Sequence, residues 1–263
     1  MAPLDRFLIT VRRSTGLATA KTARSVISGV IGLAVRHGAL SSNPVRDTSP
    51  LEAGRKKGPR ALTTEEREQW FAQLDADQVA VRKDLPDLCR FMLATGVRIG
   101  EALGVYWSDV DMDTATVRID HTVLRVKGEG LRRSPTKTAA GERTLPLPSW
   151  VVSILRERAR GEDGPVFADA LGGLRDPSNT MADLREARGT DGFAWVTSHV
   201  FRKTAATILD EAGLTARLIA DQLGHSKPSM TQDVYLGRKV VSPATAAALE
   251  GAAVKPPTGV SCG

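Results

Sequence analysis

The sequence predicts a mainly α-helical protein with a small antiparallel β-sheet. Over most of the chain, apolar residues recur at the spacing of an amphipathic helix. Only residues 115–147 alternate apolar and polar side chains at the period of a strand, with glycines between the alternating stretches, and we expect a three-stranded sheet there. We expect helices over residues 19–37, 85–94, 98–104, 148–160, 177–188, 199–212, 215–223 and 228–236.

The first sixty residues form a separate predicted unit. Val26, Val30 and Ile31 lie on one face of the helix expected over 19–37. Residues 45–61 are rich in proline, glycine and charge, as a linker between domains is. We therefore expect a helical segment and a basic linker over residues 1–60, followed by a second unit with a C-terminal tail over residues 61–263.

The second unit begins with a helix-capping motif. Thr63 is followed three residues later by Glu66, which is the spacing of a capping box. Trp70, Phe71 and Leu74 then supply an apolar face. We expect a helix directly after Thr63.

Composition excludes several classes of protein. The chain has 263 residues, of which 41% are hydrophobic and 25% charged, so it is not disordered throughout. The longest uncharged apolar run, residues 25–35, has 11 residues, whereas a membrane helix needs about 20. Asp5 and Arg6 stand where a signal peptide would be apolar. The two cysteines, Cys89 and Cys262, exclude a disulfide scaffold and a cysteine-based zinc site. We expect a cytoplasmic protein without a metal, a cofactor or a membrane association.

Positive charge is concentrated at the start of the chain. Residues 1–60 hold 11 Lys and Arg against 3 Asp and Glu, whereas the other 203 residues hold 25 against 27. Such a segment is typical of binding to nucleic acid, although a solvated terminus or an acidic protein partner would also account for it. In a DNA-binding chain the natural phosphate contacts are Arg55, Lys56, Lys57 and Arg60.

Several residues suit chemistry on an anion, although each of them alone has a plain structural interpretation. His199 and Arg202 lie one turn apart on a predicted helix, where most such pairs are ordinary surface residues. Arg98 stands at a predicted helix start, three residues before Glu101, with which it could simply form an ion pair. Lys137 lies at a predicted hairpin turn, where lysines are normally exposed to solvent.

The order of these residues carries more information than any one of them. Thr95-Gly96-Val97-Arg98 is followed by Thr136-Lys137-Thr138, by Arg143-Thr144-Leu145-Pro146-Leu147, by His199-x-x-Arg202, by Leu223-Gly224-His225 and, ten residues later, by Tyr235. This order resembles the catalytic domain of the tyrosine recombinases, the phage integrase family, over residues 62–240. The resemblance implies the fold of the DNA breaking-rejoining enzymes and a catalytic set of Arg98, Lys137, His199, Arg202, His225 and Tyr235.

The chemistry of these side chains agrees with that reaction. Two guanidiniums, Arg98 and Arg202, suit the charge that develops on phosphate oxygens when Tyr235 attacks a phosphodiester. We expect His199 to accept the tyrosine proton, Lys137 to protonate the leaving 5′-oxygen and His225 to donate to a non-bridging oxygen. The product is a 3′-phosphotyrosine, which needs neither metal nor ATP.

Two other residues near Arg98 in the sequence are expected to pack or to orient a side chain rather than to react. Tyr106 precedes Trp107 in an apolar setting typical of packing rather than of a nucleophile. Glu101 fits a buried role that orients Arg98.

The resemblance also sets expectations about partners. It implies double-stranded DNA at specific attachment sites, a homo-tetramer on paired sites and, in some members, accessory DNA-bending proteins. Residues 1–60 resemble only the last part of the helical core-binding domain that precedes the catalytic domain, so we expect its first helices to be missing. Two alternatives stay open, namely relaxation of DNA like that of a type IB topoisomerase, and a truncated DNA-binding remnant with impaired recombination.

Overall fold

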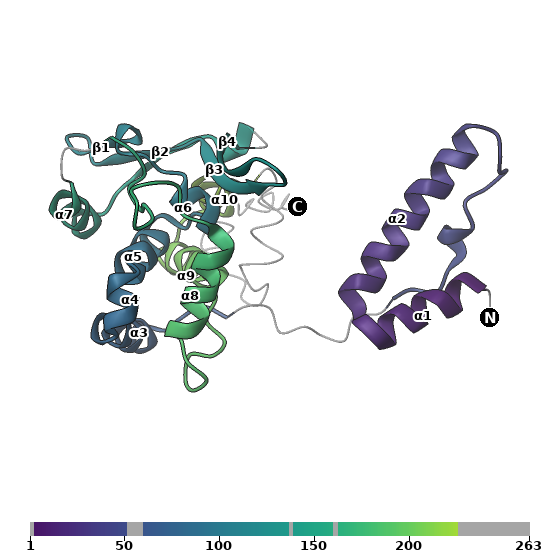
Figure 1. Cartoon of the computed structure of the whole chain (residues 1–263), viewed down its shortest axis with the longest axis horizontal. Helices are drawn as coiled ribbons and strands as arrows, with labels where there is room; N and C mark the ends of the chain where they lie inside the picture. Colours follow the sequence, from purple (N-terminus) through teal and green to yellow (C-terminus); the bar gives the residue numbers. More distant parts are fainter. Residues whose placement is uncertain (1–2, 52–59, 137–138, 160–162, 226–263) are drawn as a thin grey trace, which may run out of the picture. The chain divides into compact units, whose positions relative to one another are not determined.

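The computed structural model describes residues 3–51, 60–136, 139–159 and 163–225 (Figure 1). Its backbone contacts divide the chain into two compact units, Met1–Lys57 and Gly58–Gly263. The helix expected over residues 228–236 lies outside the described residues.

The first unit is a helical hairpin. Its elements are α1 (Pro3–Thr15), α2 (Leu17–Arg36) and a short 3-10 helix, η1 (Pro44–Asp47). Gly16 joins the two helices at a φ of 97°, and Leu8 and Ala20 are buried where they meet. The expected helix over 19–37 is confirmed, whereas α1 was not expected. Asn43 fastens the returning chain to α2, because its side-chain amide donates to the carbonyl oxygen of Ser28 at 3.0 Å.

The second unit contains most of the helices. They are α3 (Thr64–Ala76), α4 (Gln78–Arg82), α5 (Leu85–Thr95), α6 (Ile99–Leu103), α7 (Ser149–Arg158), α8 (Pro177–Ala187), α9 (Ser198–Glu211) and α10 (Ala216–Leu223), with 3-10 turns η2 (Trp107–Asp109) and η3 (Ala139–Gly141). The helices expected in this part of the described chain are confirmed to within a few residues. The five-residue α4 was not expected. Thr63 forms the expected capping box, accepting from the Glu66 N–H at 3.2 Å while its own N–H donates to the Glu66 carboxylate at 3.0 Å.

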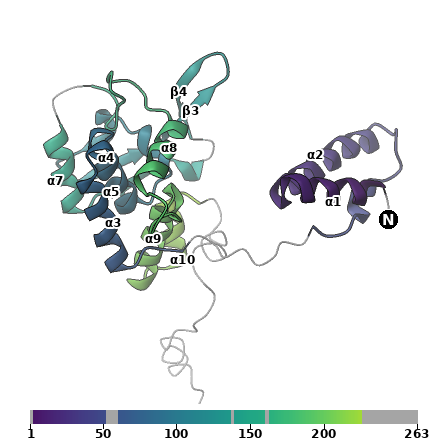
Figure 2. The same cartoon turned by 60° about the horizontal axis from the view of Figure 1, so that its bottom comes forward.

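In the described parts of the chain, the strands form two sheets rather than the single three-stranded sheet that we expected. The first has the order β1 (Val110–Asp111), β2 (Thr116–Ile119), β5 (Arg143–Pro146), and the second pairs β3 (His121–Val126) with β4 (Gly130–Pro135). All pairings are antiparallel, and Val117 faces Leu145 across the first sheet with both side chains buried. After β2 the chain makes the β3–β4 hairpin, which projects from the unit in Figure 2. It then returns to the first sheet, where β5 pairs with β2.

The core of the second unit is built around α5. This helix packs against α3, α4, α6, α7 and α9 and buries Leu88, Phe91 and Met92. Trp70 of α3 is fully buried, and its ring meets that of Phe193 edge to face at 5.4 Å. The C-terminal end of α5 lies beside α9, the helix that begins with Ser198 and His199, because a Cβ on Gly96 would lie 3.4 Å from the Cβ of Ala205 in α9. Within the described residues, none of the helices is long and apolar enough to cross a membrane.

Candidate active site

The first part of the site is the corner between α5 and α6, where Arg98 lies. Gly96 ends α5 at a φ of 68°, and a Cβ there would stand 2.6 Å from a methyl group of Leu223, so the turn requires glycine. The Arg98 N–H donates to one oxygen of Glu101 at 3.0 Å, and its guanidinium lies 2.7 Å from the other. The ion pair considered from the sequence is therefore present. The Arg98 side chain remains 43% exposed, so its cation faces solvent.

Glu101 is the buried partner of two arginines. Its side chain is 5% exposed, and its carboxylate lies 3.0 Å from Nη2 of Arg143 as well as against Arg98. Burial raises the pKa of the Glu101 carboxyl, but Arg143 and the N–H and guanidinium of Arg98 together hold it below its ordinary value. Glu101 therefore stays charged at neutral pH and orients Arg98, which is the role its position in the sequence suggested.

Among the described cations of the site, Arg202 is the most deeply buried. It is 1% exposed, and its guanidinium donates to the carbonyl oxygens of Gly96 at 2.7 Å and Leu223 at 2.6 Å. These two carbonyls stand at the C-terminal ends of α5 and α10, where a cation is favoured by the helix dipole. Arg202 therefore fastens α9 to both helix ends.

Two histidines face the same cations. Burial lowers the pKa of His225 to about 4, and the charges of Arg202 and Arg98 act in the same direction. His199 is exposed at the start of α9, and partial desolvation lowers its pKa too, again with the help of Arg202 and Arg98. Both imidazoles are consequently neutral near pH 7. The structure thus brings together Arg98, His199, Arg202 and His225, which come from three separate stretches of the sequence.

The remaining predicted site residues are placed differently. Lys137 and Tyr235, and the linker residues Arg55, Lys56 and Lys57, lie outside the described residues. Arg60 is described, and its guanidinium lies 3.8 Å from the centre of the Trp195 ring and 2.7 Å from the carboxylate of Glu66. Its side chain keeps 56% exposure, so the expected phosphate contact of Arg60 stays a prediction.

Tyr106 has the environment of a packing residue. The guanidinium of Arg133 lies 4.2 Å from the centre of its ring, and its N–H donates to Asp109 at 2.9 Å. This environment agrees with the packing role expected from the sequence.

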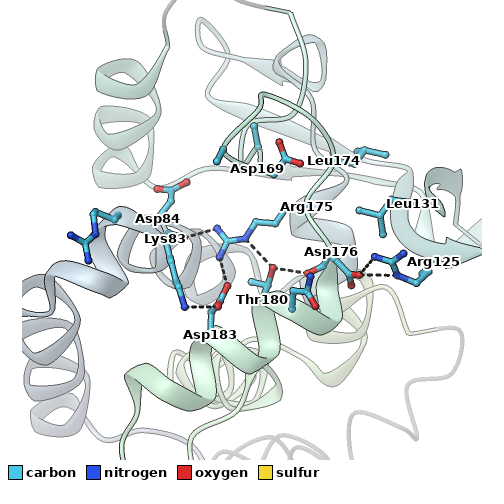
Figure 3. Close-up of a pocket in the computed structure, with 14 residues that line it drawn as sticks. Lys83, Asp84, Arg125, Leu131, Asp169, Leu174, Arg175, Asp176, Thr180 and Asp183 are labelled. Carbon is cyan, nitrogen blue, oxygen red and sulfur yellow. Dashed lines mark hydrogen bonds and ion pairs between the residues drawn. The ribbon is translucent and has the colours of Figure 1, made fainter.

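A polar pocket of about 500 Å³ shares no residue with this cluster (Figure 3). At its centre, Arg175 donates to the carbonyl oxygen of Lys83 at 2.6 Å and to the hydroxyl of Thr180 at 2.9 Å. Figure 3 also shows Arg125 paired with Asp176, which lie 2.9 Å apart through Nε. The pocket holds charges of both signs, and Lys83 at the end of α4 binds Asp183 of α8 at 2.7 Å, so these ion pairs join α8 to the end of α4. Among the described residues, no group of three His, Cys, Asp or Glu side chains is placed to hold a metal ion.

Comparisons with known proteins give one consistent answer. The profile of the phage integrase family matches residues 60–239. A XerC-like tyrosine recombinase of Caldanaerobacter subterraneus subsp. tengcongensis is 30% identical over 171 residues, which are 55% of this chain and 44% of that protein. Tyrosine recombinase XerC of Mycobacterium sp. strain KMS is 28% identical over 242 residues, covering 88% of this chain and 76% of the relative. The chain thus spans less than half the length of the first relative and about three quarters of the second.

Solved structures share the fold at lower sequence identity. The Tn1549 transposon integrase, solved in complex with a circular intermediate DNA, is 19% identical with a TM-score of 0.79, covering 95% of this chain and 84% of that chain. A lambda integrase tetramer bound to a Holliday junction is 18% identical with a TM-score of 0.59, covering 86% and 64%. The expected class, mainly α with small antiparallel sheets as in tyrosine recombinase catalytic domains, is confirmed.

Proposed function

Because the chain belongs to the phage integrase family of tyrosine recombinases, we propose that it is a site-specific recombinase that cleaves and rejoins duplex DNA through a 3′-phosphotyrosine. The observation that carries the proposal is the cluster of two guanidiniums and two neutral imidazoles around the ends of α5 and α10. Nothing in the comparisons favours a type IB topoisomerase or a remnant that only binds DNA.

The arginines bind and polarise the scissile phosphate. Arg98 is held by Glu101 from behind and leaves a large part of its side chain exposed, so it can bind an entering phosphate. Arg202 is fixed by two backbone carbonyls and adds a second permanent positive charge behind the same position. Preorganised cations of this kind stabilise the extra negative charge of the pentavalent phosphorus without a metal ion.

The protonation states of the remaining groups determine the proton transfers. His199 is neutral at pH 7 and is therefore able to accept the proton that Tyr235 loses as its oxygen bonds to phosphorus. The bond from phosphorus to the 5′-oxygen breaks, and Lys137 supplies the proton that the leaving oxygen takes up. A neutral His225 donates an N–H to a non-bridging oxygen. Attack of the 5′-hydroxyl of a second strand on the phosphotyrosine reverses these transfers and reseals the DNA.

The partners follow from the same proposal. The chain acts on double-stranded DNA at specific attachment sites, and two such sites are paired by a homo-tetramer. The existence of a lambda integrase tetramer on a Holliday junction supports that assembly, since this chain shares the fold of that enzyme. The basic residues 1–60 supply phosphate contacts in addition to those of the catalytic unit.

A covalent-capture experiment tests the function and identifies the target sequence at the same time. The full chain is incubated with a radiolabelled library of randomised duplexes, and the products are separated on a denaturing gel. We expect a protease-sensitive protein–DNA adduct, and we expect captured sequences to support strand exchange between two duplexes. Absence of any adduct would contradict the proposal, and relaxation of a supercoiled plasmid without exchange would favour the topoisomerase alternative.

A further inference from the structure

Arg143 of β5 holds three separate segments of the site with one guanidinium. Its Nη2 lies 3.0 Å from the Glu101 carboxylate, its Nε donates to the carbonyl oxygen of Gln222 at 2.9 Å, and its Nη1 donates to that of Gly141 at 2.8 Å. The side chain is 8% exposed, so these bonds are shielded from water. A buried cation with three fixed acceptors has little freedom to move.

Each of the three segments leads to a residue of the proposed chemistry. Glu101 holds Arg98, the cation that faces the phosphate. Gln222 is in the last turn of α10, directly before Leu223-Gly224-His225. Gly141 follows Lys137 by a few residues in the same connection between β4 and β5. A shift of the Arg143 guanidinium would therefore move several reacting groups relative to one another.

The end of α10 shows how tightly Arg143 is fitted. Two guanidiniums cap adjacent carbonyls, Arg143 that of Gln222 and Arg202 that of Leu223. Gly224 then turns the chain at a φ of 68°, and a Cβ there would stand 2.7 Å from Nη1 of Arg143 and 2.8 Å from the carbonyl oxygen of Ala140. Glycine at this position therefore serves the turn and also the close approach of Arg143.

We propose that Arg143 is a positioning residue for the DNA cleavage step. It fixes the position of Arg98 through Glu101 and the position of His225 through the end of α10. This proposal rests on the recombinase function proposed above. Arginine is required because its planar fork reaches three acceptors in different directions, whereas the single nitrogen of lysine does not.

The experiment compares Arg143 with an arginine of similar structural importance elsewhere in the unit. Arg158 donates to Asp84 at 2.5 Å and to the carbonyl oxygen of Val166 at 3.0 Å, with a side chain that is 20% exposed. Within the part of the chain that the structure describes, its hydrogen bonds and ion pairs reach none of the proposed site residues. Full-length Arg143→Met, Arg143→Lys and Arg158→Met are prepared. For each, the Kd for a captured duplex, the single-turnover rate of covalent attachment at saturating DNA and the thermal midpoint are measured.

We expect Arg143→Met to attach about 10²-fold more slowly than the wild type at saturating DNA, because displacement of reacting groups by about an ångström costs that much. Its Kd should change little, and Arg143→Lys should recover only part of the rate. Arg158→Met should lose thermal stability but retain the wild-type rate per folded molecule. Rates are normalised to the folded fraction at each temperature.

A second measurement does not depend on activity. The charge of Arg143 helps to lower the pKa of His225, so NMR titration of this imidazole should give a higher pKa in Arg143→Met and an unchanged one in Arg158→Met. If the wild type forms the adduct, an unchanged attachment rate in Arg143→Met would overturn the role of Arg143, and so would equal rate losses in Arg143→Met and Arg158→Met. Either result would leave the recombinase function standing. A wild type that forms no adduct would overturn both.

Discussion

The guanidinium of Arg202 lies 2.7 Å from the carbonyl oxygen of Gly96, although 106 positions separate the two residues in the sequence. The same guanidinium donates to Leu223, so the ends of α5 and α10 are joined through one buried cation. Burial of a charge is costly unless it is fully hydrogen-bonded. The two helix ends supply two of these hydrogen bonds, which hold the cation in place before DNA binds.

Arg202→Lys should impair both catalysis and folding. An ammonium cannot reach both carbonyls in the plane of the guanidinium, and an unsatisfied buried carbonyl costs about 1–3 kcal/mol. We expect the attachment rate to fall by about 10²-fold or more and the thermal midpoint to decrease. Arg185→Lys, on the exposed side of α8, serves as the control and should match the wild type. An Arg202→Lys variant with wild-type attachment would rule out the proposed role of this cation.

His225 should make the stability of the protein depend on acid. Its pKa is about 4 in the folded chain, below the ordinary value of 6.5, so the unfolded chain binds the additional proton between these values. The neutral His225 therefore contributes up to about 3 kcal/mol to the free energy of unfolding. This contribution is present above pH 6.5 and is lost as the pH falls toward 4. Urea unfolding of the wild type and His225→Gln over this range isolates the effect. Parallel pH profiles for the two proteins would contradict it.

Much of the fold could be predicted because its signals are local. The capping box at Thr63 and Glu66 and the apolar period of α5 each occupy a few adjacent residues. The unexpected helix α1 has a comparable apolar face in Leu4, Phe7, Leu8 and Val11, so its signal is local too. The division into two sheets could not be read in the same way, because the pairing of β5 with β2 is set by tertiary contacts across the β3–β4 hairpin.

The sequence predicted candidate residues for the site but not the contacts that support them. The order of Arg98, His199, Arg202 and His225 led to the expectation that these side chains act together, and their catalytic roles stay predictions. The bonds of Arg202 to Gly96 and of Arg143 to Gln222 end on backbone carbonyls, which any residue type carries, so no side-chain pattern reveals them. Arg143 begins Arg143-Thr144-Leu145-Pro146-Leu147, a stretch that belongs to the family pattern, but the sequence assigns it no role. The proposed role comes from its pairing with Glu101, which only the structure shows.

Lys137 should be dispensable when the leaving group needs no proton. Lys137→Ala is expected to attach slowly to normal DNA and much faster to the same duplex with sulfur at the bridging 5′ position, because a thiolate departs readily near neutral pH. Arg98→Ala should stay slow on both substrates, since it acts on the non-bridging oxygens. The measurement is the single-turnover rate of adduct formation on each duplex. Equal impairment of Lys137→Ala on both would assign the acid to another residue.

The basic linker should contribute to the salt dependence of DNA binding. Neutralising Arg55, Lys56, Lys57 and Arg60 together should reduce the slope of log K against log salt by about 0.9 for each phosphate that these side chains neutralise in the wild type. Exchange of Arg82 and Arg185, exposed in the second unit, for glutamine serves as the control for a general decrease in charge. A slope that the linker substitutions leave unchanged would mean that these four side chains face solvent in the complex.

The central claim is that Tyr235 is the nucleophile, and it is tested by identifying the residue that becomes covalently bonded to DNA. The captured duplex is incubated with the wild type, Tyr235→Phe and Tyr106→Phe, and the adduct is digested and sequenced by mass spectrometry. We predict that the wild type and Tyr106→Phe carry the nucleotide on Tyr235, and that Tyr235→Phe binds the duplex with unchanged affinity but forms no adduct, because only the attacking hydroxyl is removed. An adduct formed by Tyr235→Phe, or a modified peptide that contains Tyr106, would show that Tyr235 is not the nucleophile.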